Sequence, residues 1–535
     1  MYIVYDKKDL SVIAILDNNS SNIANSKTVE KMFPGHQLID IWEVSIDHSI
    51  KPNQLRVLLD DLMEPKELLC NGKSIYTVTD SEKNKRHHYR IDTLKKQLSN
   101  SYPPSFVRSL NAKVINFWKS SIYTSPEIRE SLADFSYFSG NKISPVTWWG
   151  PYTDAGGYAS MNRSIAFRLH NYHVIPRIEI CPTAPQISPL ANYYISNYTS
   201  IDVSRFKRKI KVWGFTPCPH PPENGKNIMY TMMETETLHP EFVRLCNSYS
   251  DEVWVPTKHN EVVFKKSGVK KPIYVFPLGI DEKVYACQNE IIYPGDINDT
   301  SHLVSVIGKP ISEGINKFRF ITLFGWSFRK GTDILIKSFV EAFTEDDDVA
   351  LIIVSRYAGA SNRGGMNVII DDVSRYAHSI RKKNFPQILL YPDVIPEGDM
   401  PKVYKMGHAF FHTSRGEGFS LPQIEAAACG LPVISCNNTG MSEYLNDSNS
   451  YMITTNETEI GSPEMHWITP FYHGQLFPKL GREQILQASS HLKYVRSNYD
   501  EALRKARILK EDVFSKYTWD IATQKISNRL KELYL

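Results

Sequence analysis

The stretch Ser414-Arg-Gly-Glu-Gly-Phe-Ser-Leu-Pro-Gln-Ile-Glu425 holds two carboxylates, Glu417 and Glu425, around an expected helix start. Ser420 is a good N-cap and Gln423 stands three residues after it, so the two residues predict a capping box. Glu425 would then lie about one turn inside the helix. Glu417 would lie in the glycine-flanked loop before it. A loop that opens a helix after a short apolar run is typical of α/β folds.

This pair of carboxylates has two interpretations. In the functional one, both carboxylates and the positive end of the helix dipole surround one pocket, where carboxylates bind sugar hydroxyls and the helix end binds phosphate. In the structural one, Glu417 lies on the surface and Glu425 only compensates the charge of the helix start. The spacing by itself leaves both interpretations open.

A second motif is Phe324-Gly-Trp-Ser-Phe-Arg-Lys-Gly-Thr332. Arg329 and Lys330 end the loop between an expected strand and an expected helix, and Gly331 permits close approach of the backbone. Two cations at a helix N-terminus are unfavourable unless an anion arrives, because the helix dipole is already positive there. The motif therefore indicates a phosphate or diphosphate site. The alternative is a pair of exposed cations that point into solvent.

A third motif is Asp154-Ala-Gly-Gly157, directly after an expected strand at 146–149. Gly156 and Gly157 at that place would let backbone N–H groups face a ligand. The motif is neither the Gly-x-Gly-x-x-Gly pattern of dinucleotide-binding proteins nor a P-loop. It is a weak indication when taken alone.

Length and composition describe a globular protein. A chain of 535 residues predicts two or three domains, and the 42% apolar and 22% charged residues are typical of soluble proteins. No stretch approaches the roughly 18 apolar residues of a membrane span. The N-terminus shows no secretion signal, and seven scattered cysteines without a Cys-x-x-Cys pair favour neither disulfides nor zinc. A cytoplasmic location is expected.

The charge of the chain excludes few classes of function. The net charge of +4 is too small to imply nucleic acid. Basic residues gather at 83–90 and at 205–211. Each cluster is either a solvated face or linker, or a surface for an anionic acceptor or for membrane headgroups.

The order of the apolar runs predicts the domain organisation. Residues 2–5 and 11–16 read as a hairpin in a small N-terminal unit. From 144 onward short strands alternate with helices, in one series to about 276 and in a second from 318, so two mostly parallel sheets are expected. The polar stretch at 288–316 reads as the connection between them. Ligands bind at the carboxyl ends of such strands.

Taken together, the segments from about residue 144 to the C-terminus resemble the GT-B glycosyltransferases, specifically the retaining group known as family four. Ser414 to Glu443 resembles the Glu-x7-Glu signature of that family with its Gly-x-Pro-Val-Ile tail. Arg329 to Asp333 resembles the diphosphate-binding segment, and Tyr391 to Met400 the loop near the nucleotide base. The implied fold is α/β, with two Rossmann-like doubly wound domains facing across a cleft, and with a small N-terminal α+β accessory domain.

The resemblance also implies domain boundaries. Residues 1–140 would form the accessory domain, whose role is unknown. Residues 141–305 would form the N-terminal GT-B domain on the acceptor side, and residues 306–510 the C-terminal GT-B domain on the donor side. Residues 511–535 would form a C-terminal helix that packs back on the N-terminal GT-B domain.

Roles for single residues follow from the resemblance as well. Glu425 would bind the ribose hydroxyls, and Glu417 would bind the transferred sugar beside the anomeric centre. Arg329 and Lys330 would hold the diphosphate and stabilise its charge as it leaves. The other positions implied on the donor side are Gly331, Gly156, Gly157, Gly418, Phe419, Ser420, Leu421 and Met400.

Two departures from the family concern catalysis. Trp326 stands where many members have an arginine, so Arg329 and Lys330 would act alone. Met233 stands where many members have a histidine near the acceptor, and Glu234 is the candidate that would serve instead. Glu417 and Glu234 are thus the two candidate catalytic residues.

The implied activity is retaining transfer of a hexose-type sugar from a nucleotide-diphosphate sugar to an unidentified acceptor, which could be a glycan, a lipid-linked glycan, a protein or a modified nucleic acid. No Asp-x-Asp motif is suitably placed, so neither a metal nor a cofactor other than the nucleotide sugar is expected. One alternative is other chemistry on the same fold, such as a phosphorylase or an epimerase. Another is a degenerate GT-B protein that only binds glycan or nucleic acid.

Overall fold

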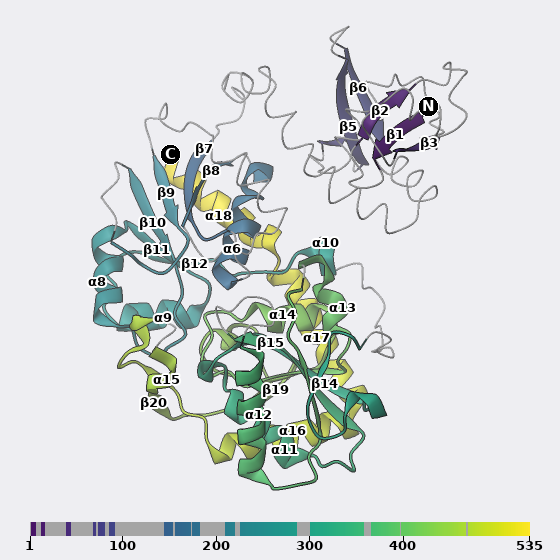
Figure 1. Cartoon of the computed structure of the whole chain (residues 1–535). Helices are drawn as coiled ribbons and strands as arrows, with labels where there is room; N and C mark the ends of the chain where they lie inside the picture. The colour runs from purple at the N-terminus through teal and green to yellow at the C-terminus, as the bar shows by residue number, and fades with distance from the viewer. Residues whose placement is uncertain are drawn as a thin grey trace. The chain divides into compact units, whose positions relative to one another are not determined.

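The computed structural model separates the chain into two compact units, residues 1–141 with 189–197, and residues 142–188 with 198–535. In the first unit it describes strand segments alone, and in the second unit most of the chain (Figure 1). The described residues are 2–6, 12–16, 39–43, 68–70, 73–80, 85–90, 144–152, 156–172, 174–181, 209–219, 225–285, 300–357, 365–395, 397–466 and 469–534.

The described strands of the first unit form two antiparallel sheets. β1 (Tyr2–Asp6) pairs with β2 (Val12–Leu16), which confirms the expected hairpin, and on its other side with β3 (Ile39–Glu43). The second sheet has the order β4-β5-β6 and consists of β4 (Leu68–Cys70), β5 (Lys73–Asp80) and β6 (Lys85–Arg90). The basic cluster at 83–90 thus falls mainly on β6, and most of the one at 205–211 lies outside the described residues.

The first sheet of the second unit is parallel throughout, with the order β12-β11-β10-β9-β7-β8. Helices follow several of its strands, as the strand–helix alternation predicted. The elements are β7 (Ser144–Gly150), α6 (Gly157–Ala166), η2 (Leu169–Tyr172), β8 (Val174–Ile180), β9 (Ile210–Trp213), β10 (Lys226–Tyr230), α8 (Pro240–Tyr249), β11 (Glu252–Val255), α9 (Lys258–Lys266), β12 (Ile273–Val275) and α10 (Glu282–Tyr285).

The second sheet has the order β13-β16-β15-β14-β17-β18-β19, and only its edge strand β13 is antiparallel. Without β13, this is the Rossmann order 3-2-1-4-5-6, in which the strand order reverses between β14 and β17. The elements are β13 (Val304–Ile307), η4 (Ile311–Glu313), β14 (Phe318–Trp326), η5 (Phe328–Lys330), α11 (Thr332–Ala342), β15 (Val349–Tyr357), α12 (Met366–Ile380), β16 (Gln387–Tyr391), η6 (Glu397–Asp399), α13 (Met400–Tyr404), β17 (Ala409–His412), α14 (Leu421–Ala428), β18 (Val433–Cys436), η7 (Thr439–Glu443) and β19 (Tyr451–Ile453).

The two parallel sheets confirm the predicted α/β class. The central strands β14 and β15 are buried at most of their positions, as strands covered on both faces are. Two details were not predicted. The stretch at 288–316 was expected to be a patternless connection, yet β13 lies in it, on the short apolar run Leu303-Val-Ser-Val-Ile307 that this interpretation overlooked. The strands β8, β9 and β19 were also missed.

Between β19 and the helices that end the chain lies a short segment of strands and short helices. The segment contains β20 (Thr458–Ile460), α15 (Pro463–His466), η8 (Pro470–Tyr472) and β21 (Leu476–Pro478). The strands β20 and β21 pair antiparallel. We call residues 458–478 the arm. The helices α16 (Arg482–Ser497) and α17 (Tyr499–Lys516) follow it, and α17 contacts α14.

The C-terminal helix α18 (Trp519–Tyr534) lies against the first sheet of the second unit. It contacts α6, η2, β7 and β8. The hydroxyl of Tyr172 donates to the carbonyl oxygen of Asp520 at 3.0 Å, and the guanidinium of Arg529 pairs with Glu252. The chain crosses from the second sheet to the first between α17 and α18, at Tyr517 and Thr518, where Thr518 forms a bridge with Ile280.

Within the described ranges, no helix has the length and apolar character needed to cross a membrane. Nor do three or more His, Cys, Asp or Glu side chains gather there in a group that could hold a metal ion. Five cysteines are free thiols, namely Cys181, Cys218, Cys246, Cys429 and Cys436.

Candidate active site

Two loops meet at the point where the strand order of the second sheet reverses. One follows β14 and carries Arg329 and Lys330, and the other follows β17 and carries Glu417. The backbone N–H of Arg415 donates to the carbonyl oxygen of Arg329 at 2.8 Å, and the Thr413 hydroxyl donates to that of Gly331 at 2.8 Å. These bonds join the loops at the carboxyl edge of the sheet, where ligands bind in doubly wound folds.

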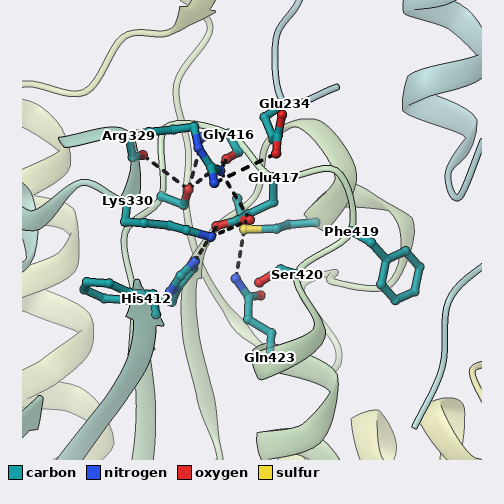
Figure 2. A network of polar contacts seen from close by, with 12 residues as sticks. Glu234, Arg329, Lys330, His412, Gly416, Glu417, Phe419, Ser420 and Gln423 are labelled. Atoms are coloured by element: carbon teal, nitrogen blue, oxygen red, sulfur yellow. Dashed lines mark hydrogen bonds and ion pairs between the residues drawn. The ribbon is translucent and has the colours of Figure 1, made fainter. Parts of the chain in front are cut away.

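Glu417 is the centre of a buried ion cluster (Figure 2). The ammonium of Lys330 contacts both of its carboxylate oxygens, at 2.6 and 2.8 Å. The guanidinium of Arg329 lies 3.4 Å from Oε2 and also donates to the carbonyl oxygen of Gly416. Nε2 of His412 lies 3.1 Å from Oε1. Since an ionised carboxylate only accepts, this contact places the imidazole proton on Nε2.

Electrostatics keep the carboxylate ionised. Burial alone would raise the pKa of Glu417, but the charges of Lys330 and Arg329 and the hydrogen bond from His412 hold that pKa well below its usual value of 4.5. Burial and the neighbouring Arg329 lower the pKa of Lys330, and the charge of Glu417 opposes this. Burial also lowers the pKa of His412, which favours its neutral form.

This cluster corrects two expectations. The cations were expected either to await an external anion or to point into solvent, but the chain itself supplies an anion, and Arg329 is only 8% exposed. The structural interpretation that placed Glu417 on the surface is wrong, because Glu417 is 4% exposed. Buried charges of this kind persist only when they are paired, which is why the two motifs come together.

Glu234 joins the cluster from the segment that follows β10 in the first sheet. Its Oε1 lies 3.8 Å from Nη2 of Arg329, and its Oε2 accepts a hydrogen bond from the hydroxyl of Tyr472 at 2.8 Å. Met233, the residue that stands where a histidine was expected, is 2% exposed and packs in the apolar core of the first sheet. The candidate acceptor-side carboxylate is therefore next to the candidate diphosphate loop.

The loop after β17 passes close to the segment that carries Glu234. A Cβ on Gly416 would lie 1.9 Å from the backbone oxygen of Glu234, and a Cβ on Gly418 would lie 2.6 Å from Cγ and Sδ of Met232. Only a residue without a side chain permits this approach at Gly416, because the obstacle is backbone.

We expect Gly416→Ala to lower the free energy of unfolding by about 1–3 kcal/mol more than Gly418→Ala does, because a rigid carbonyl must move in the first variant and a flexible thioether side chain in the second. Urea unfolding of the two variants beside wild type measures the difference. Equal stability of the two variants would show that the loop and the Glu234 segment separate freely.

The start of α14 differs from the prediction. Ser420 precedes the helix as expected, but it has φ 71° and ψ 74°, its side chain forms no cap, and its buried hydroxyl has no hydrogen-bond partner. The amide of Gln423 instead contacts the sulfur of Met441 at 2.8 Å. The capping box is thus wrong. A left-handed conformation at a residue other than glycine is uncommon and costly, and such residues cluster at functional sites.

Phe419 points away from the ion cluster (Figure 2). Its ring packs against Tyr444 and Tyr517, at centroid distances of 5.5 and 5.9 Å. The hydroxyl of Tyr444 donates to the carbonyl oxygens of Phe419 and Ser420. Phe419 therefore anchors the loop by packing against these two rings. Leu421, the first residue of α14, is half-buried.

Glu425 belongs to a separate part of the site. It is half-buried on α14, and its Oε2 accepts a hydrogen bond from the hydroxyl of Tyr404 at 2.8 Å. Tyr404 ends α13, the short helix that begins at Met400. Two segments expected near the nucleoside, the start of α13 and Glu425, are therefore linked through a tyrosine that the sequence did not single out.

The glycines of the third motif lie at the start of α6. Gly156 is the N-cap, and Gly157 is exposed with open space where a Cβ would be. The next residue, Tyr158, accepts a hydrogen bond from the backbone N–H of Met232 at 3.0 Å and contacts the Thr231 hydroxyl at 3.1 Å. Tyr158 thus ties α6 to the segment that ends in Glu234.

Besides Tyr404, sequence reasoning missed three polar side chains at the site. His412 ends β17, Tyr472 comes from the arm, and Tyr158 follows Gly157. Only His412 had a usable signal, since it ends an apolar run just before the loop of Glu417. Trp326 is explained as core, because it is 1% exposed and its indole N–H donates to Asp372 at 3.0 Å.

Comparison with protein families identifies the domain that holds this site. Residues 313–462 match the family model described as Glycosyl transferases group 1. The range includes both loops of the ion cluster and Glu425. This part of the chain is therefore a glycosyl transferases group 1 domain, which confirms the resemblance to glycosyltransferases.

Individual proteins match over different extents. The chain is 38% identical over 58 residues to O-antigen chain mannosyltransferase B of Escherichia coli, a match that spans 11% of this chain and 15% of the relative. Among solved structures, Alr3699/HepE of Anabaena in complex with UDP-glucose has 14% identity and a TM-score of 0.48, over 73% of this chain and 100% of that chain. A glycosyltransferase of Rickettsia africae ESF-5 has 12% identity and a TM-score of 0.49, over 74% and 99%.

Proposed function

We propose that the protein is a retaining, metal-independent glycosyltransferase that moves a hexose-type sugar from a nucleotide-diphosphate sugar to an acceptor. The observation that carries the proposal is the buried cluster of Arg329, Lys330 and Glu417 at the switch point of a glycosyl transferases group 1 domain. Two adjacent cations and one carboxylate match the two ends of such a donor, its diphosphate and its sugar hydroxyls.

The donor diphosphate would take over part of the charge that Glu417 now neutralises. Lys330 and Arg329 would contact its oxygens, and the carboxylate of Glu417 would turn to the hydroxyls of the transferred sugar. This exchange keeps the two buried cations paired in both states, so it avoids the cost of an uncompensated buried charge. Charge that develops on the leaving diphosphate would meet donors that are already in place.

The nucleoside would lie at α13 and α14. Glu425 would bind the ribose hydroxyls, with Tyr404 holding its carboxylate, and Met400 would lie near the base. The N-terminal end of α14, with Gly418 and Ser420 before it, would face the phosphates with free backbone N–H groups. The unpaired hydroxyl of Ser420 supports this, because buried polar atoms normally have a partner.

Glu234 would act on the acceptor. It is the carboxylate that the first sheet contributes beside Arg329, at 3.8 Å. In retaining transfer on one face of the sugar, the acceptor hydroxyl attacks from the side of the leaving diphosphate and loses its proton as the bond forms. A carboxylate or the departing phosphate oxygen can take that proton.

The test is release of nucleotide from a panel of UDP-glucose, UDP-N-acetylglucosamine and GDP-mannose, in buffer with EDTA. We expect wild type to release nucleotide from at least one donor. Glu425→Ala should bind the same nucleotide about tenfold or more weakly, because it loses charge-assisted hydrogen bonds to the ribose.

Three outcomes would count against the proposal. Release that appears only when a divalent cation is added would overturn metal independence. A β-configured product from an α-configured donor, read by NMR, would overturn retention. No release and no nucleotide binding would overturn the function as a whole, and binding of a polyanion with a steep salt dependence would then favour the binding module.

A further inference from the structure

In the sequence, the arm lies between elements of the second sheet's half, but it packs against the half that contains the first sheet. It leaves after β19 and returns at α16, both of which lie with the second sheet. Its side chains Met465, Tyr472 and Phe477 are nevertheless buried in the apolar core that contains Phe242 and Phe264 of α8 and α9. Figure 1 shows α15 and β20 next to these helices.

Hydrogen bonds fix the arm directly beside Glu234. The backbone N–H of Glu236 donates to the carbonyl oxygen of Leu476 at 2.8 Å, and that of Leu476 donates to the hydroxyl of Thr237 at 3.1 Å. The Thr237 hydroxyl in turn donates to the amide oxygen of Gln475 at 3.0 Å. The arm therefore holds the backbone that follows Glu234.

Tyr472 reaches Glu234 itself. Its ring is 2% exposed and packs edge-on against Phe477 at 5.3 Å, and its hydroxyl donates to Oε2 of Glu234 at 2.8 Å. Burial raises the pKa of Tyr472 well above its usual value, so the hydroxyl keeps its proton and donates. The carboxylate is thus held between a neutral donor from the arm and the cation of Arg329, 3.8 Å from its other oxygen.

We propose that Tyr472 is a positioning residue, and that the arm of the donor-side half thereby sets the orientation of the acceptor-side carboxylate Glu234. The inference rests on the proposed role of Glu234 in transfer. Apolar packing alone does not explain the tyrosine, because a phenylalanine would fill the same core without a hydroxyl that must be satisfied. With the hydroxyl in place, Glu234 points its free oxygen at the diphosphate loop only when the arm is docked.

Tyr472→Phe tests the proposal, because it removes the hydrogen bond and keeps the ring. With UDP-glucose, or another donor of the panel that wild type turns over, and with water as the acceptor, we expect kcat to fall about ten- to a hundredfold, the range that loss of one hydrogen bond to a charged group gives. The KM for the donor should change less than about twofold, because the diphosphate loop and Glu425 keep their contacts.

Two controls separate positioning from folding. Tyr451→Phe removes another buried hydroxyl, one that has no hydrogen-bond partner, and should leave kcat and the melting temperature unchanged. In a double-mutant cycle, Tyr472→Phe should have no further effect on kcat in a Glu234→Gln background, because both changes act on the same carboxylate.

The outcomes distinguish this proposal from the proposed function. Wild-type kcat in Tyr472→Phe, or effects of the two substitutions that simply add, would overturn the positioning role while transfer itself stands. A fall in kcat accompanied by an equal fall in stability would also overturn it, since packing would then account for the loss. A wild-type protein that turns over no donor would overturn the proposed function, and the positioning role with it.

Discussion

Glu417→Gln is expected to reduce donor turnover by about a hundredfold or more while UDP binds at least as tightly as to wild type. Glutamine keeps the shape but loses the charge-assisted hydrogen bonds to the sugar, each of which contributes about 1.5–3 kcal/mol. Lys330 and Arg329 lose the anion that now neutralises them, so the cations are more available to a diphosphate. Single-turnover kinetics and calorimetric titration with UDP measure the two quantities separately.

Glu425→Gln is the matched control for this separation of turnover from UDP binding, because it should weaken UDP binding. A Glu417→Gln variant that loses UDP affinity in parallel with turnover would contradict the assignment of Glu417 to the sugar. It would show instead that the carboxylate only holds the diphosphate loop in place.

The same substitution should also lower stability, in a pH-dependent way. An isolated buried cation costs about 3–5 kcal/mol when its partner is removed. Because the folded-state pKa of Glu417 lies below the usual value of 4.5, its stabilisation is fully present above about pH 4.5 and is lost as the pH falls through the folded-state pKa. The difference in unfolding free energy between wild type and Glu417→Gln should therefore shrink in acid.

Lys330→Ala is expected to weaken UDP binding by about tenfold to a hundredfold and to lower turnover at least as much. The ammonium is held 2.6 Å from Glu417 at the switch point, so it is in place for a diphosphate before the donor arrives. A buried, charge-assisted contact of this kind contributes about 1.5–3 kcal/mol. Calorimetric titration with UDP and with UDP-glucose measures the loss.

Lys337→Ala is the control, since Lys337 lies on the adjacent helix α11 with its ammonium 5.7 Å from the ring of Tyr376. UDP affinity should be unchanged in this variant. Wild-type UDP affinity in Lys330→Ala would place the diphosphate elsewhere. Arg329 would then be the remaining cation of the cluster to test.

The chemistry of the site was predictable to the extent that it is local. Arg329 and Lys330 were found because two cations before a helix conflict with its dipole, and Glu417 because two glycines flank it. The helix after Ser420 was also predicted, but not its capping. The bonds that hold this loop come from Tyr444 and Gly440, which lie beyond the helix, and with them Ser420 takes a left-handed conformation instead of capping.

The alternation of apolar runs and glycine-rich turns determined the α/β class, because hydrophobic periodicity is a property of neighbouring residues. Only the tertiary structure decided the pairing of charges. Lys330 and Glu417 are 87 residues apart, and Tyr472 and Glu234 are 238 residues apart. Which buried charge meets which partner depends on strand order and on the path of the arm, and a buried charge is stable only where the completed fold brings that partner to it.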